Sequence, residues 1–155
     1  MKINNNLKIM VLLLALAAMF TGCKSFSSIK NKDWGLIAVR TTPENITFER
    51  AKLVEEGFGD IFTLRFETDR AGGIGAPNRY TAPYTTSGKQ DLTIQTVAIT
   101  MMAPLREPEK LKEKDYFAYL QNTSTWNLAG GKLELHTKKE NDTEAVLVFT
   151  SGKKK

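Results

Sequence analysis

Apolar and polar residues alternate with a period of two along most of the chain from residue 34 onward, which predicts half-buried β-strands. The pattern is clearest from Ile61 to Glu67, where Phe62, Leu64 and Phe66 fall on one face. Shorter or weaker alternations repeat the signal elsewhere. The predicted strands cover residues 34–39, 46–53, 61–67, 80–84, 92–94, 123–128, 133–135 and 145–150. The pattern therefore predicts a mainly β domain of about eight strands.

Turn-forming residues separate these apolar runs. Glycine, asparagine or aspartate clusters lie at residues 56–60, 87–89, 130–131 and 140–142. These residue types accept positive φ and so allow the chain to reverse. Gly130-Gly131 gives the clearest hairpin signal, because it separates two short alternating runs. Short strands joined by such turns favour an antiparallel sheet.

One segment breaks the β pattern and predicts a single helix over approximately residues 107–121. Pro108 suits the first helical position, and Leu111, Phe117 and Leu120 can share one buried stripe. The charged remainder is most simply a solvated face. It comprises Lys110, Lys112, Glu113, Lys114 and Asp115.

The N-terminus has the composition of an export signal. Lys2 and Lys8 precede an apolar or small run over residues 9–20, which is shorter than the roughly 20 residues that span a bilayer. Cys23 follows small residues and resembles the acylated cysteine of a bacterial lipobox. An ordinary cleavage site at Ala15-Leu16-Ala17 is the alternative, and it would leave Cys23 as a free thiol.

These signals divide the chain into four parts. We expect a lipoprotein signal peptide at residues 1–22, a flexible tether at 23–33, one domain at 34–150 and a basic tail at 151–155. Removing residues 1–22 from the 155 leaves 133, which suits one domain with its own core.

The net charge and the cysteine content exclude further classes of partner and of stabilising bond. Loss of residues 1–22 removes two lysines and no acid, so the net charge falls from +5 to +3. Three terminal lysines, Lys153 to Lys155, account for the rest, so the body is near neutral and we expect no nucleic-acid partner. The single cysteine excludes an intramolecular disulfide.

The glycine cluster Gly72-Gly73-Ile74-Gly75 raises the question of phosphate binding. A Walker loop requires a Gly-Lys-Ser/Thr ending, which does not follow this cluster. A dinucleotide loop requires a third glycine and a following helix, whereas Ala76-Pro77-Asn78 and a predicted strand follow here. We therefore interpret the cluster as a sharp turn or bulge between antiparallel strands, in which the glycines adopt conformations closed to other residues.

An ordered set of short motifs resembles the META domain family, also called HslJ-like. The motifs are Trp34-Gly35-Leu36, Leu64-Arg65-Phe66, the turn from Gly73 to Tyr80 with Tyr84, Ile99 to Ala103, Tyr116-Phe117 with Leu120, and Leu133 with Leu135. A final apolar strand completes the set, so the resemblance spans approximately residues 34–150.

The resemblance implies a small antiparallel barrel-like domain with one helix, often exported and lipid-anchored. It also implies a role in heat-shock or envelope-stress response and in drug tolerance, with no accepted enzymatic activity. Its turn residues correspond to Gly73, Gly75, Asn78 and Tyr80. Family members commonly carry one cysteine in this turn and another after the Thr-x-Met stretch. This chain has Ala76-Pro77 and Ala103-Pro104 at these places. The joint absence is consistent with two segments that lie near each other, and it removes any redox function based on those two thiols.

The remaining candidate residues favour structure over chemistry. His136 is the single histidine and is expected to face solvent. A zinc site would therefore need unusual ligands, and no nucleophile-elbow sequence accompanies His136 as the base of a catalytic triad. Met101 and Met102 are expected to fill gaps in the core. We therefore expect no catalytic residue, no metal and no cofactor.

The sequence thus predicts a monomeric, non-enzymatic lipoprotein of the cell envelope. It would be held to the membrane by a lipid on Cys23 and would act by binding another envelope protein. In enteric bacteria an aspartate after the acylated cysteine retains a lipoprotein in the inner membrane. Lys24 does not resemble this signal, so the outer membrane is favoured. The alternative function is a small-molecule or lipid carrier whose barrel interior is lined by Tyr80 and Tyr84.

Overall fold

The computed structural model describes residues 25–103, 106–138 and 144–152. Ten strands are found in this part of the chain. They are β1 (Trp34–Thr41), β2 (Ile46–Thr47), β3 (Thr63–Phe66), β4 (Arg70–Ile74), β5 (Arg79–Ser87), β6 (Asp91–Ile94), β7 (Ala98–Ile99), β8 (Thr123–Ala129), β9 (Lys132–Lys138) and β10 (Glu144–Ser151). The helices are η2 (Phe26–Ser28), α2 (Arg50–Glu55) and α3 (Glu113–Gln121).

Eight of these strands form a closed antiparallel barrel. Their order is β10, β9, β8, β6, β5, β4, β3 and β1, and β1 pairs back onto β10 to close the ring. The short strands β2 and β7 pair with β1 and β5 outside this ring. The predicted mainly β, barrel-like fold is therefore confirmed.

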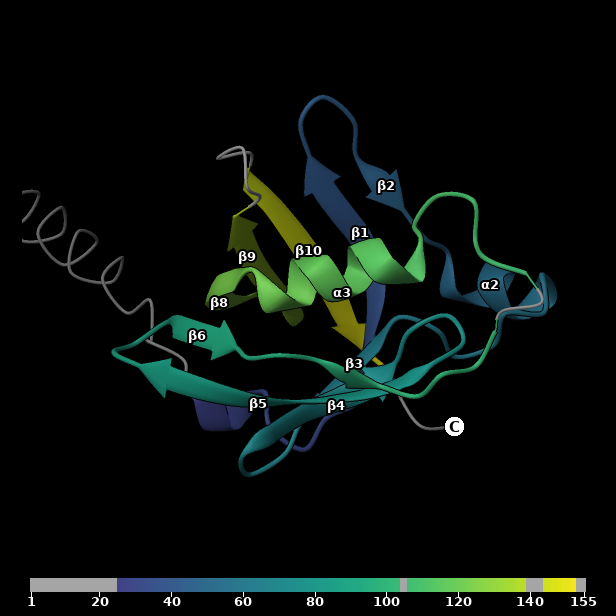
Figure 1. Cartoon of the computed structure of the whole chain (residues 1–155). Helices are drawn as coiled ribbons and strands as arrows, with labels where there is room; N and C mark the ends of the chain where they lie inside the picture. Colours follow the sequence, from purple (N-terminus) through teal and green to yellow (C-terminus); the bar gives the residue numbers. More distant parts are fainter. Residues whose placement is uncertain (1–24, 104–105, 139–143, 153–155) are drawn as a thin grey trace, which may run out of the picture.

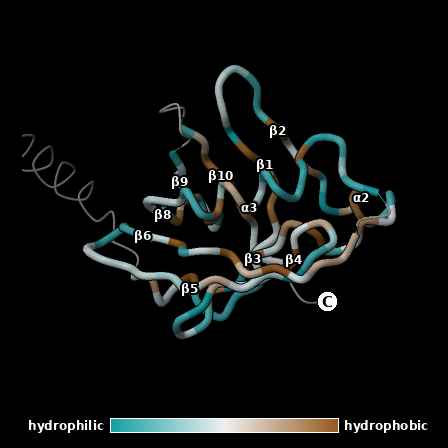
Figure 2. The backbone as a smooth tube through the Cα atoms, in the orientation of Figure 1, coloured by the Kyte–Doolittle hydropathy of each residue, from teal (hydrophilic) through white to brown (hydrophobic). Residues whose placement is uncertain are grey.

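Helix α3 lies across the barrel between its two groups of strands (Figure 1). Its buried side chains include Tyr116, Phe117 and Leu120, which join one continuous hydrophobic core. Figure 2 shows hydrophobic and hydrophilic stretches interleaved along the strands. This is the arrangement expected when one face of each strand points inward.

The weak strand predicted over residues 46–53 is wrong beyond its first two residues. β2 ends at Thr47 and α2 begins at Arg50. The helical turn buries Leu53 beside Phe48, and Arg50 Nη1 donates a hydrogen bond to the Ile61 carbonyl at 2.7 Å. These tertiary contacts outweigh the local alternation that suggested a longer strand.

The predicted helix over residues 107–121 exists, but it begins at Glu113. Pro108 and Leu111 are buried in an irregular segment and are not helical. The expected buried stripe is confirmed at Phe117 and Leu120. The start was placed too early because an apolar residue can reach the core from irregular backbone as well as from a helix.

The flexible tether expected over residues 23–33 is also wrong for residues 25–33. Ile29 is completely buried, and its carbonyl accepts a hydrogen bond from Trp34 Nε1 at 3.0 Å. The ring of Phe26 lies 5.2 to 5.4 Å from the rings of Phe66, Tyr84 and Trp126. The buried Ile29 and the Phe26 ring thus join this polar-looking segment to the domain.

The signal peptide, Cys23 and the lysines at 153–155 lie outside the described residues. Among the described residues, no helix is long and apolar enough to cross a membrane.

Candidate functional site

The turn between β4 and β5, residues 75–78, is built around a buried asparagine, and we name it the Asn78 turn. Asn78 Nδ2 donates to Glu113 Oε2 at 2.7 Å and to the Met102 carbonyl at 3.2 Å. Asn78 Oδ1 accepts hydrogen bonds from Thr100 Oγ1 at 2.9 Å and from the Met102 backbone N–H at 2.8 Å. The amide thus uses both its donor and its acceptor capacity.

Glu113, the first residue of α3, holds the same turn from the other side. Its Oε1 accepts hydrogen bonds from the backbone N–H groups of Ala76 at 2.5 Å and of Asn78 at 2.7 Å. Glu113 was expected on a solvated helix face, and this prediction is wrong because the side chain is only 8% exposed. The buried N–H groups of the turn need an acceptor, and Glu113 supplies it.

The Asn78 turn requires a glycine at residue 75 because of space and not because of backbone conformation. The φ of Gly75 is not positive, unlike that of Gly130 or Gly131. A Cβ at residue 75 would lie 2.5 Å from Glu113 Oε1 and 2.6 Å from Phe117 Cζ. The glycine is therefore required for close approach of α3, and the expected special backbone conformation is wrong. The interpretation of the whole glycine cluster as a turn is wrong for its first three residues, because Gly72, Gly73 and Ile74 belong to β4 and pair with β5. A Cβ at Gly73 would clash with the Thr63 carbonyl of the neighbouring strand.

The Asn78 turn fixes the backbone of a second segment, Ile99–Met102, which we name the apolar segment. Ile99 is 48% exposed, Met101 97% and Met102 58%. The methionines were predicted to fill the core, and this prediction is wrong. The expected proximity of the two motif segments is confirmed by the hydrogen bonds between Asn78 and Met102. Exposed apolar side chains on a fixed backbone are typical of a contact surface.

Tyr80 follows the Asn78 turn and forms a buried pair with Tyr116. Both hydroxyls donate to the carbonyl of Thr63, at 2.7 Å from Tyr80 and 2.9 Å from Tyr116. Burial, followed by the charge and the hydrogen bond of Tyr116, raises the pKa of Tyr80 well above its usual value. Burial likewise raises the pKa of Tyr116, although the hydrogen bond with Tyr80 and the charge of Arg50 act in the opposite direction.

The two tyrosines suggested for a ligand cavity are part of the core. Tyr80 packs edge-on against Phe117, and Tyr84 packs edge-on against Phe66. The Tyr84 hydroxyl donates to the Glu67 carbonyl at 2.7 Å. Their rings and hydroxyls are thus engaged by the protein, so the geometry does not support an interior ligand site at these residues.

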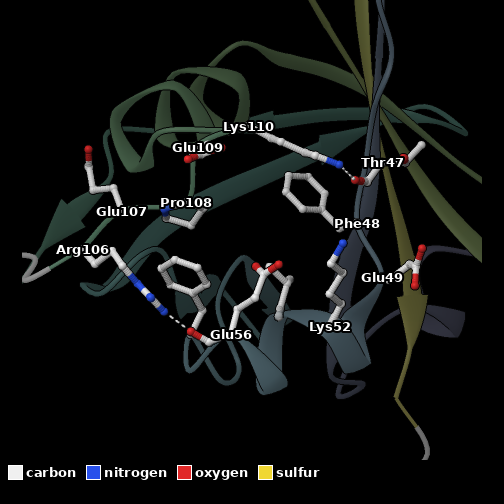
Figure 3. A pocket seen from close by; sticks show the side chains of 12 residues that line it. Thr47, Phe48, Glu49, Lys52, Glu56, Arg106, Glu107, Pro108, Glu109 and Lys110 are labelled. Atoms are coloured by element: carbon white, nitrogen blue, oxygen red, sulfur yellow. Dashed lines mark hydrogen bonds between the residues drawn. The ribbon is translucent and has the colours of Figure 1, made fainter.

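A surface pocket of about 360 Å³ lies between α2 and the segment that precedes α3 (Figure 3). Phe48, Leu53 and Phe58 supply its apolar lining, and charged side chains surround them. Figure 3 shows the side chains of Lys52 and Glu56, at α2 and its C-terminal end, directed into the pocket. Arg106 lies over the Phe58 ring at 4.6 Å and donates to the Glu56 carbonyl. The charged lining also includes Glu49, Glu107, Glu109 and Lys110.

The sequence did not identify Glu113, Thr100 or the pocket. Glu113 and Thr100 act on Asn78 across 35 and 22 residues of chain, so no local pattern shows their contact. One signal was present, namely a carboxylate at the start of an apolar stripe, which is typical of a helix N-terminus. His136 lies half-buried on β9. In the described ranges no group of three or more His, Cys, Asp or Glu residues is placed to hold a metal.

Comparisons with known proteins agree with this architecture. The family model described as META domain matches residues 27–152. A protein from Burkholderia xenovorans, solved by NMR, has a similar fold with a TM-score of 0.59 and 20% sequence identity. The match covers 83% of this chain and 86% of that chain. No curated protein matches the sequence.

Proposed function

The chain belongs to the META domain family, and from this premise we propose that it is a non-catalytic, membrane-anchored binding module of the bacterial cell envelope. The observation that carries this proposal is the apolar segment. Met101 and Met102 are exposed, yet the backbone of Met102 is bonded to Asn78 at both its N–H and its carbonyl. A surface that is already ordered loses little entropy when a partner binds.

The polar groups behind the apolar segment support a structural role and not a catalytic one. The carboxylate of Glu113 is occupied by three donors from the Asn78 turn. The Asn78 amide is saturated, and the hydroxyls of Tyr80 and Tyr116 share one carbonyl. Asn78 and Glu113 therefore hold the apolar segment in place, and the two tyrosine hydroxyls tie β5 and α3 to β3. The surface itself is apolar and suits a protein partner.

The membrane anchor is proposed from the N-terminal sequence. Cys23 follows an apolar run and small residues, as in a bacterial lipobox. Two or three acyl chains give stable anchoring where one chain is marginal. We place the protein in the cell envelope, with the outer membrane preferred, where it would serve envelope maintenance or the response to envelope stress.

The experiment that tests the binding role is site-specific photo-crosslinking in cells of the source organism. A photo-reactive amino acid at Met101 is expected to capture a discrete envelope protein, because this side chain is almost fully exposed on the proposed surface. The matched control places the same group at Val54, which is also apolar and 60% exposed but lies on α2. Identical adducts at both positions, or none at Met101, would contradict the proposal.

The surface pocket supports a second candidate, binding of an amphipathic small molecule. Its volume of about 360 Å³ lies within the range of ligand sites, and it combines aromatic rings with charged side chains. Native mass spectrometry after incubation with an envelope extract is expected to show an adduct of small mass. The exposed Lys52 offers a variant, Lys52→Ala, that should weaken this adduct; an unchanged adduct would exclude the pocket.

A further inference from the structure

The first described residues are fastened to one end of the barrel. The ring of Phe26 contacts Phe66, Tyr84 and Trp126, which belong to β3, β5 and β8. Lys30 is held there as well, because its amine donates to the Thr68 carbonyl at 3.3 Å and lies 5.7 Å from the rings of Phe26 and Tyr84. The domain therefore begins three residues after Cys23.

This short connection limits how far the barrel can move from an anchored cysteine. Three residues of extended chain span at most roughly 10 Å. The headgroup region on each side of a bilayer is itself about 5 to 7 Å thick. An acylated Cys23 lies at the boundary between headgroups and hydrocarbon, so Phe26 cannot be far outside the headgroup layer.

The tip of the β5–β6 hairpin, residues 88–90, lies beside this anchored end. Ser25 and Phe26 share a surface groove of about 350 Å³ with Thr86, Gly88, Lys89, Asp91 and Trp126. The Asp91 carboxylate is engaged by the Ser87 hydroxyl at 3.1 Å at the base of the hairpin, whereas Lys89 lies at its tip. Lys89 is exposed, and Lys30 lies on the same end of the molecule. A lysine close to an anionic membrane surface contributes about 1 kcal/mol of binding free energy.

We propose that the anchored protein rests directly on the bilayer, with the Phe26 segment and the β5–β6 hairpin in the headgroup layer and Lys89 facing anionic lipid. This inference rests on the proposed acylation of Cys23. A domain on a long flexible tether could rotate freely above the membrane, whereas this domain would keep the same end turned toward the bilayer.

The orientation has a consequence for the apolar segment. β5 runs as one strand from Arg79, next to the Asn78 turn, to Ser87, next to the hairpin tip. At about 3.4 Å per residue, these eight steps separate the two ends by roughly 27 Å. Figure 1 shows the β5–β6 hairpin and α2 at opposite ends of the molecule. The proposed contact surface and the pocket therefore lie away from the bilayer, accessible to a partner.

Lysine footprinting on vesicles tests this orientation. The full chain is expressed with its own leader in a bacterium, checked for acylation by mass, and reconstituted into vesicles of phosphatidylethanolamine and phosphatidylglycerol. A water-soluble acetylating reagent then modifies accessible lysines. Lys89 is expected to react severalfold more slowly than Lys52, which is also exposed but belongs to α2.

A matched control lengthens the connection. Fifteen Gly/Ser residues inserted between Lys24 and Ser25 add roughly 20 Å of flexible chain, and Lys89 is then expected to regain the reactivity of Lys52. Equal reactivity of the two lysines in the acylated parent chain would overturn the orientation alone. A chain without acyl mass would overturn the anchor and, with it, the orientation, so the mass measurement separates the two failures.

Discussion

The Gly130-Gly131 hairpin and the Asn78 turn both depend on glycine, but for different physical reasons. Gly130 and Gly131 have φ of 57° and 77°, and an added Cβ at either position would meet nothing within 4 Å. Gly75 has no positive φ, yet an added Cβ would meet both Glu113 and Phe117. The hairpin uses the conformational freedom of glycine, whereas the Asn78 turn uses its small size.

The difference shows how much each turn depends on the rest of the fold. The hairpin joins two adjacent strands, β8 and β9, and its requirements are local. The Asn78 turn joins β4 to β5 but is completed by α3 and by the apolar segment. A change at the hairpin should therefore stay local, while a change at the Asn78 turn should loosen the proposed contact surface.

The largest expected effect is that of Gly75→Ala. The methyl group must displace either Glu113 or Phe117, which combines overpacking with the loss of buried hydrogen bonds. We expect the free energy of unfolding to fall by roughly 3 to 5 kcal/mol, measured by urea denaturation. An effect below about 1 kcal/mol would contradict the close-approach explanation.

Alkaline pH should sharpen the comparison, because the two buried tyrosines belong to the elements that the Asn78 turn joins. Tyr80 lies in β5 two residues after Asn78, and Tyr116 lies in α3 three residues after Glu113. The pKa of each is raised by folding, so the unfolded chain loses these protons first as the pH rises above about 10. Their stabilising contribution is complete below that pH and is lost above it. Two such groups lower the free energy of unfolding by up to about 2.7 kcal/mol per pH unit.

The variant Tyr116→Phe provides the control for this titration. It removes one of the two groups, so the difference in slope between parent and variant excludes the contribution of surface lysines. The slope above pH 10 is expected to fall by about 1.4 kcal/mol per pH unit in the variant. If the free energy of unfolding fell with the same slope above pH 10 in the parent and the variant, Tyr116 would not be one of the groups responsible.

Glu113→Gln should have a smaller effect, about 2 kcal/mol. The substituted amide can still accept hydrogen bonds from the N–H groups of Ala76 and Asn78, but its NH₂ group would face the Asn78 Nδ2 donor. Hydrogen exchange is expected to rise at Met102 as well, because Asn78 also holds its N–H. An unchanged exchange rate at the Met102 amide would show that Glu113 does not help to order the apolar segment.

The smallest expected effect is that of Gly131→Ala in the hairpin. The methyl group meets no neighbour, so the cost is the strain of a positive φ, about 1 kcal/mol. Gly131→Asn should cost less, because asparagine tolerates this region. A loss at residue 131 as large as that of Gly75→Ala would remove the distinction between the two turns.

The same comparison explains what the sequence could predict. Most strands and the Gly130-Gly131 hairpin follow from neighbours in the chain, so alternation and turn residues were sufficient to predict them. β4 was missed because its glycines give no apolar alternation and were interpreted as a turn, and the two-residue strand β7 is too short to show a pattern. Glu113 was wrongly predicted to face solvent because its partners in the Asn78 turn are 35 and 37 residues away. Met101 was misplaced because hydrophobicity predicts burial only on average, and an exposed apolar residue is itself the informative observation.

The prediction of a flexible tether before the domain was wrong for a related reason. Phe26 and Ile29 stand among serines and lysines without a periodic pattern, so composition favoured a tether. Their burial depends on the rings of Phe66 and Trp126, which only the complete barrel brings together. The family resemblance predicted the barrel and the proximity of the two motif segments, but neither the hydrogen bonds that join them nor the pocket beside α2.

The pairing of β1 with β10 also determines when the molecule can fold. Trp34 pairs with Ser151, so the ring is closed by partners from the first and last strands of the domain. Contacts between residues so far apart in sequence form slowly, because the whole intervening loop must be closed first. The ring cannot close until the last strand has been synthesised. For a chain proposed to pass through a membrane before it matures, this topology delays completion of the barrel and favours the unfolded form that export requires.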